Sequence, residues 1–323
     1  MLQMVGVLIL ALGLPAMFQS FEHDHLDNRA MVLGYVVMRI PMVAQWARAG
    51  RQDPGRRAVS HVYIATIVIS QIAWCALLAV DVPIAPFFAI AAVPLAIELS
   101  GPIIAERKHG GTPWHPHHIA ERYSLLVIIA LGEGLVGTMA TLAAIVGPEG
   151  PGWTIDVAAL GLAGTALTFG MWWIYFIIPS GELLVAHRNR SFGWGYGHML
   201  LFAAIVAVGA GLHVAAYAIE GHCALSLPQT VLCTAIPVAI YIAAIFALYS
   251  ALTRSYDPTH SWMLIASAVP IAASVGLSHF GVGLAWCIAV LALTPWASVF
   301  GYELVGHRHN ARMIEEAEAA RER

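Results

Sequence analysis

Four ionisable residues stand out among those inside the long apolar segments of the sequence, where charged groups are rare. They are Arg39, Glu98, Glu133 and His198. A charged side chain in lipid is costly, so such residues normally face the protein interior or a watery cavity and pair with one another. Together the four could form a stepped polar path that carries protons or binds an ion or a small solute. The alternative is a set of structural ion pairs that hold helices together.

The depth of each residue in its segment predicts which of the four could meet. A helix rises about 1.5 Å per residue. Arg39 lies nine residues into segment 30–48 and Glu133 ten residues into segment 123–146, which puts both near the middle of the membrane. Glu98 and His198 both lie about 10 Å beneath one membrane surface. Equal depth therefore favours the pairs Arg39–Glu133 and Glu98–His198, although the rotation of each helix is not fixed by depth.

Glu133 has the most informative neighbours of the four residues. Gly132 and Gly134 bracket it, and two residues without side chains leave space around the carboxylate for water, an ion or another backbone. We therefore predict that Glu133 is the central titratable site and that Arg39 is its counter-charge. Glu98 and His198 would then form a relay toward the cytoplasm.

A second polar group is predicted to open the helix that carries Glu133, in the sequence WHPHHIAERY at 114–123. His118 and Glu121 are three residues apart and Arg122 is one turn from His118, so these side chains would lie close together on a helix. His115, His117, His118 and Glu121 could reach a metal ion. However, no ligand template such as H-E-x-x-H occurs, and a charged helix entrance explains the same residues. We expect neither a metal nor another cofactor.

Aromatic residues gather in the sequence WWIYF at 172–176. Trp173 and Tyr175 could form a platform on which a substrate stacks. A belt of interfacial aromatic residues, which is common where a helix leaves the membrane, would explain the same pattern.

Ten apolar segments must position these residues. Charged residues make up only 11% of the 323 residues, whereas soluble domains carry about 25%. Each segment can cross the hydrocarbon core, which needs roughly 20 helical residues. Backbone groups in lipid must be satisfied within the segment, so we predict an all-α polytopic transmembrane helix bundle. The segments are 1–18, 30–48, 59–80, 83–105, 123–146, 155–178, 192–219, 228–252, 262–279 and 280–300.

The basic residues are sorted by side. Of the 16 Lys and Arg residues, 14 fall in the loops and ends on one side, Arg29 falls on the other, and Arg39 lies inside a segment. By the positive-inside rule, the side that is rich in Lys and Arg is cytoplasmic. Ten crossings place both ends of the chain on that side, so both termini are predicted to be cytoplasmic. We expect a multi-pass protein of the inner membrane, surrounded by lipids, with a bundle at 1–303 and a charged cytoplasmic tail at 304–323. Nucleic acid is not an expected partner.

Three passages make the chain similar to a known family. They are HIAERYSLLVIIALGEGLVGT at 118–138, WWIYF at 172–176 and GYGHMLLFAAIVAVGAGL at 195–212. With them the chain resembles the bacterial low temperature requirement protein A family. Members usually begin with a helix bearing a motif like E-L-F-F-D-L-V-F-V, so this chain is expected to lack about two N-terminal helices. The resemblance marks ten residues of this chain as positions of the family's motifs, without implying what chemistry they do. They are His118, Glu121, Arg122, Gly132, Glu133, Trp172, Trp173, Tyr175, Tyr196 and His198.

The resemblance implies a polytopic inner-membrane protein whose activity is poorly defined. Together with the ionisable residues, it favours transport or permeation of a small solute or ion, which could be coupled to protons. Two alternatives remain open. One is a membrane-embedded enzyme that uses the cluster from His115 to Glu121, and the other is a sensory or assembly protein, for which the C-terminal tail would be the place to look.

Overall fold

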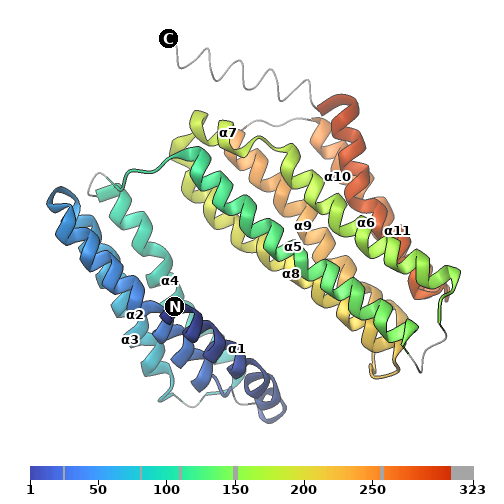
Figure 1. The fold of residues 1–323 in the computed structure, drawn as a ribbon, viewed down its shortest axis with the longest axis horizontal. Helices are drawn as coiled ribbons and strands as arrows, with labels where there is room; N and C mark the ends of the chain where they lie inside the picture. Colours follow the sequence, from blue (N-terminus) through green and yellow to red (C-terminus); the bar gives the residue numbers. More distant parts are fainter. Residues whose placement is uncertain (25, 81, 109–110, 148–151, 255–257, 307–323) are drawn as a thin grey trace. The chain divides into compact units, whose positions relative to one another are not determined.

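The computed structural model describes residues 1–24, 26–80, 82–108, 111–147, 152–254 and 258–306 (Figure 1). The regular structure in these ranges is helical throughout. Ten helices in the described ranges are long and apolar enough to cross a membrane, which confirms the predicted fold class. The predicted tail extends beyond this part, because residues 307–323 lie outside the described ranges. The cytoplasmic position of both termini stays a prediction.

The chain divides into two compact units, residues Met1–Pro113 and Trp114–Arg323. The boundary falls inside the bundle that was predicted for residues 1–303. Because each unit has its own internal packing, each is described by itself.

The first unit contains four long helices that follow one another in the chain. α1 and α2 approach closely because glycines face each other, and a Cβ atom placed on Gly6 would lie only 2.6 Å from the carbonyl oxygen of Gly34. The apolar core of the unit is small and includes Leu26, Leu77 and Phe87. The elements are α1 (Leu2–Ser20), the 3-10 turn η1 (Phe21–His23), α2 (Arg29–Gln52), the 3-10 turn η2 (Pro54–Arg56), α3 (Arg57–Leu77) and α4 (Ile84–Lys108).

The second unit contains the larger core. α8 packs against both α5 and α9, and α11 packs against both α6 and α10 (Figure 1). Residues such as Leu167, Leu201 and Ile288 are completely buried between these helices. The elements are α5 (Pro116–Val146), α6 (Ile155–Ile177), α7 (Ser180–Ala186), the 3-10 turn η3 (Arg188–Arg190), α8 (Ser191–Ile219), α9 (Leu227–Thr253), α10 (Pro258–His279), α11 (Leu284–Gly301) and the π-helical turn η4 (Tyr302–Gly306).

The start of α5 lies in the polar stretch 114–123, which was expected to open this helix. The apolar segment begins at residue 123, and α5 begins seven residues earlier, at Pro116. Proline suits the first helical position because the N–H group that it lacks would have no partner there. As a consequence, His118, Glu121 and Arg122 lie in the first turns of the helix that carries Glu133.

Candidate functional site

Arg39 and Glu98 form an ion pair inside the first unit. Nη2 of Arg39 lies 2.5 Å from Oε1 of Glu98, and the two side chains are only 19% and 14% exposed. The Tyr35 hydroxyl donates to the other carboxylate oxygen of Glu98 at 2.6 Å. The Ser70 hydroxyl lies 3.2 Å from that same oxygen. Side chains from α2 and α3 therefore surround one carboxylate on α4, and the two opposite charges cancel.

This ion pair corrects the pairing that depth alone favoured. The observed partner of Arg39 is Glu98, whereas equal depth pointed to Glu133. Arg39 lies ten residues after the first residue of α2 and Glu98 fourteen residues after the first residue of α4. A four-residue difference corresponds to about 6 Å along a helix axis. The long arginine side chain covers that distance, so the rotation of the helices decides the pairing rather than equality of depth.

Glu133 pairs with a histidine of the second unit. Nε2 of His213 lies 3.3 Å from Oε1 of Glu133, and the His213 and Glu133 side chains are 30% and 42% exposed. Glu133 lies in α5 and His213 in α8. The sequence reasoning assigned no role to His213, so this partner of Glu133 was missed. An acidic and a basic side chain thus meet between two of the long apolar helices.

Glycines bring α5 and α8 close enough for this contact. A Cβ atom on Gly209 would lie 2.6 Å from Cγ of Glu133, and one on Gly137 would lie 2.7 Å from the carbonyl oxygen of Gly209. Glu133 and Gly137 are four residues apart on α5, as Gly209 and His213 are on α8, so each pair shares a helix face. The Thr141 hydroxyl adds a bond across the interface, because it donates to the carbonyl of Leu212 at 2.9 Å.

The two glycines that bracket Glu133 differ in their surroundings. A Cβ atom on Gly132 would meet nothing within 4 Å, as predicted for a residue that leaves space. Gly134, in contrast, is packed against α6, where a Cβ atom would lie 2.6 Å from the hydroxyl oxygen of Thr168. Only one side of the carboxylate therefore keeps the open space that the sequence pattern suggested.

Replacement of Gly209 by alanine tests the importance of this close approach. We expect Gly209→Ala to lower the free energy of unfolding by about 1–3 kcal/mol, because the added methyl group overpacks the interface. Thermal unfolding of the purified protein would measure the change. Gly276→Ala is the matched control, since a Cβ atom there meets nothing within 4 Å. Equal stability of the two variants would contradict the proposed contact.

His198 is completely buried and has two hydrogen-bond partners. Its Nδ1 atom lies 2.8 Å from the carbonyl oxygen of Trp194. Its Nε2 atom lies 3.0 Å from the hydroxyl oxygen of Tyr175. A carbonyl oxygen only accepts, so Nδ1 carries the proton and Nε2 accepts from the tyrosine. The neutral imidazole is therefore fully satisfied, and Tyr175 takes the place that depth suggested for Glu98.

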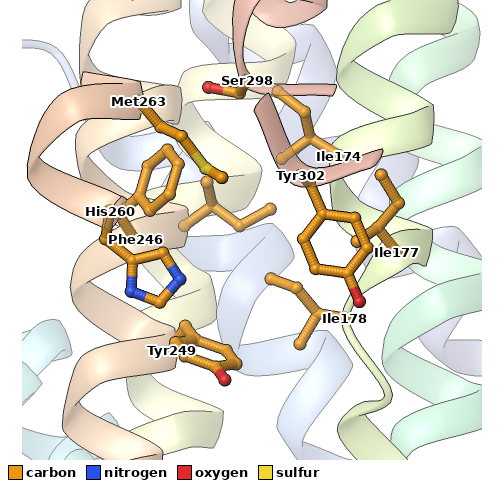
Figure 2. A pocket seen from close by; sticks show the side chains of 10 residues that line it. Ile174, Ile177, Ile178, Phe246, Tyr249, His260, Met263, Ser298 and Tyr302 are labelled. Carbon is orange, nitrogen blue, oxygen red and sulfur yellow. The ribbon is translucent and has the colours of Figure 1, made fainter. Parts of the chain in front are cut away.

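Two small cavities lie in the second unit, and the smaller of them is lined by this histidine and tyrosine. The larger has a volume of about 40 Å³ and lies between α6, α9, α10, α11 and η4. Figure 2 shows the rings of Tyr249, His260 and Tyr302 around it, with isoleucines of α6 beside them. The smaller cavity, of about 10 Å³, is lined by Tyr175, His198 and again Tyr249. A water molecule needs roughly 10–15 Å³ of such space, so the smaller cavity has room for about one water molecule and the larger for a few.

The histidine-rich start of α5 lies on the protein surface. Nδ1 of His118 is 3.7 Å from Oε2 of Glu121, and these side chains are 76% and 67% exposed. Within the part of the chain that the structure describes, no three His, Cys, Asp or Glu side chains are arranged to hold a metal ion. The exposed pair of His118 and Glu121 fits the charged helix entrance that was one of the two explanations of this segment.

A comparison with protein-family models identifies the relationship of the chain. The model for the bacterial low temperature requirement A protein (LtrA) matches residues 1–294. The chain belongs to the LtrA family. No curated protein and no solved structure matches the chain.

The residues that the LtrA resemblance singled out fall into three environments of the second unit. Exposed positions include Trp172 and Trp173 on α6 and the three polar residues at the start of α5. Glu133 and Gly132 lie in the middle of α5. Tyr175 and His198 are buried and bonded to each other. The pattern WWIYF thus splits, because the two tryptophans fit an aromatic belt whereas Tyr175 belongs to the core.

Sequence reasoning missed several residues that the structure of this LtrA protein brings into its polar sites. In the first unit they are Tyr35, Ser70, Gln71 and Trp74, and in the second unit the main one is His213. One signal could have revealed His213. Glycine stands four residues after Glu133 and four residues before His213, a spacing that allows two helices to pack with both side chains on the shared face.

Proposed function

We propose that this LtrA protein moves a small solute or ion across the inner membrane and that the movement is coupled to protons. The contact between Glu133 and His213 carries the proposal. A carboxylate and an imidazole can each bind and release a proton, and intramembrane residues of these types commonly form proton relays and ion pathways. Helix packing alone does not require a carboxylate and an imidazole next to an open space, as Glu133 and His213 are.

The surroundings of the two acidic residues support a division of roles. Glu98 is only 14% exposed and is held by the guanidinium of Arg39, so its charge is balanced. Glu133 is 42% exposed, has one weaker base as its partner, and stands beside the open space at Gly132. We therefore assign proton exchange to Glu133 and a structural, charge-balanced role to the pair of Arg39 and Glu98. His198, with Tyr175, would act near the cytoplasmic end of the path.

Reconstitution into liposomes tests the proposed function. The purified protein would be placed in vesicles that contain a pH-sensitive dye, and a potassium diffusion potential would drive protons inward. We expect faster acidification than in vesicles without protein, and a further change when the transported solute is added from a panel of neutral, anionic and cationic compounds. Acidification at the rate of empty vesicles with every compound would contradict the proposal.

A further inference from the structure

Three arginines lie at one end of the second unit, where α8 begins and α9 ends. Arg188 and Arg190 are the first and last residues of η3, which leads directly into α8, and Arg254 follows the last residue of α9. Nη1 of Arg190 donates to the carbonyl of Leu252, two residues before Arg254. The charges of Arg190 and Arg254 are close enough to repel each other. The three positive charges therefore belong to one surface.

The guanidinium groups on this surface are held in place by groups that carry no net charge. Nη2 of Arg188 donates to the carbonyl of Trp114 at 2.9 Å, and its guanidinium carbon lies 4.5 Å from the centre of that ring. Among the described residues, no carboxylate forms an ion pair with Arg188, Arg190 or Arg254. The surface therefore keeps its positive charge.

N–H groups of these arginines remain available to a ligand from outside. A guanidinium has five N–H donors in a planar fork, which matches the oxygens of a phosphate group. Arg188 and Arg190 use only part of their donors on carbonyl oxygens. The Arg254 side chain is exposed and forms no hydrogen bond with a described residue. Because Arg188 is exposed as well, an anion can reach this surface without any movement of the helices.

The position of the arginines along the helices specifies the kind of anion. Two of the segments that are long and apolar enough to cross a membrane are Arg188–Ile219 and Leu227–Thr253. The arginines therefore stand at the ends of two such segments, at the level where lipid headgroups begin. Trp114, which packs on Arg188, is of a residue type that is enriched at this same level. Basic residues at the ends of spanning helices attract the headgroups of anionic lipids.

We propose that Arg188, Arg190 and Arg254 form a binding site for the headgroup phosphate of an anionic phospholipid. The phosphate oxygens accept hydrogen bonds from the guanidinium N–H groups, and the negative charge of the lipid offsets the repulsion between the arginines. A soluble phosphate ion has the same oxygen chemistry, but it lacks the acyl chains that hold a lipid beside the two helices. The site involves neither Glu133 nor His213, so it stands whether or not the protein moves protons.

Native mass spectrometry of the whole chain, released from detergent micelles, tests the proposal. Phosphatidylglycerol is the anionic probe, and phosphatidylcholine at the same concentrations is the zwitterionic one. We expect phosphatidylglycerol to bind more tightly, and its binding to weaken about fivefold in Arg254→Gln and again by about that factor when Arg188→Gln is added. Arg56→Gln is the matched control and should bind the lipid unchanged, because the Arg56 guanidinium lies 2.8 Å from a carboxylate oxygen of Asp53 and is already neutralised.

Two further measurements complete the test. The melting temperature in lipid-free detergent shows which variants are folded, and Arg254→Gln alone decides the result if the double variant melts earlier, because the Arg254 side chain has no bond with a described residue to lose. Inorganic phosphate is the third probe, and we expect it to leave the bound lipid in place at equal concentration. Displacement by phosphate, equal binding of the two lipids, or unchanged phosphatidylglycerol binding in folded Arg254→Gln protein would overturn the proposal.

Discussion

Replacement of Glu133 by glutamine is expected to reduce proton flux to the rate of vesicles without protein. Glutamine has nearly the same size and still forms hydrogen bonds, but it neither binds nor releases a proton near neutral pH. The contact with His213, at 3.3 Å in the unmodified protein, can persist as a hydrogen bond. Only the titration of the residue is removed, so the variant should remain folded while proton flux is lost. The dye assay in reconstituted vesicles would measure the change.

The matched control for this prediction is Glu121→Gln. Glu121 lies in the same helix, α5, but its side chain is 67% exposed near the helix start, where it faces His118. We expect nearly unchanged flux from this variant. His213→Gln should give an intermediate result, because Glu133 keeps its carboxylate but loses the neighbouring base. Normal flux through folded Glu133→Gln protein would end the proposed mechanism, whatever the effect of the other two variants.

Removal of Arg39 alone is expected to cause the largest loss of stability. Arg39→Leu leaves the Glu98 carboxylate, which is 14% exposed, without an opposite charge. Breaking one side of a buried ion pair lowers the free energy of unfolding by about 3–5 kcal/mol, and we expect the lower end of that range here because neither partner is fully buried. Denaturant titration in detergent, followed by tryptophan fluorescence, would measure it.

The double variant Arg39→Leu with Glu98→Leu separates charge from packing. When both partners are replaced by apolar residues of fitting size, the stability of a buried pair is often recovered. We therefore expect the double variant to be more stable than Arg39→Leu. A double variant as unstable as the single one would show that the side chains act through their shape and their bonds to Tyr35 and Ser70, and not through the balance of charge.

The ten helices of the described residues that are long and apolar enough to cross a membrane could be predicted, because the membrane imposes a simple requirement on each segment. A segment of about 20 apolar residues must satisfy its own backbone in lipid, and this is a property of the segment alone. The observed α6 (Ile155–Ile177) and α8 (Ser191–Ile219) lie within a residue of the predicted 155–178 and 192–219. α5 begins at Pro116, inside the polar stretch 114–123 that was expected to open this helix.

The partners of the ionisable residues could not be predicted in the same way. Depth follows from counting along one helix, but contact requires the rotation and the separation of two helices. Arg39 meets Glu98 because α2 and α4 turn these faces toward each other, and the arginine side chain covers their difference in depth. His213 meets Glu133 because Gly137 and Gly209 let α5 and α8 approach closely. The rotation and the separation of two helices are properties of the pair, so they cannot be predicted from the sequence of one segment.

The sequence alone determined the fold class of this LtrA protein, the number of its spanning helices and which spanning helices carry ionisable groups. These properties depend on composition and length, which act locally. The tertiary structure decided that Glu133 has His213 as its partner, that Glu98 is neutralised by Arg39, and that His198 is bonded to Tyr175. Those contacts depend on side-chain packing between distant segments, where a change in helix rotation replaces one partner by another while every depth stays the same.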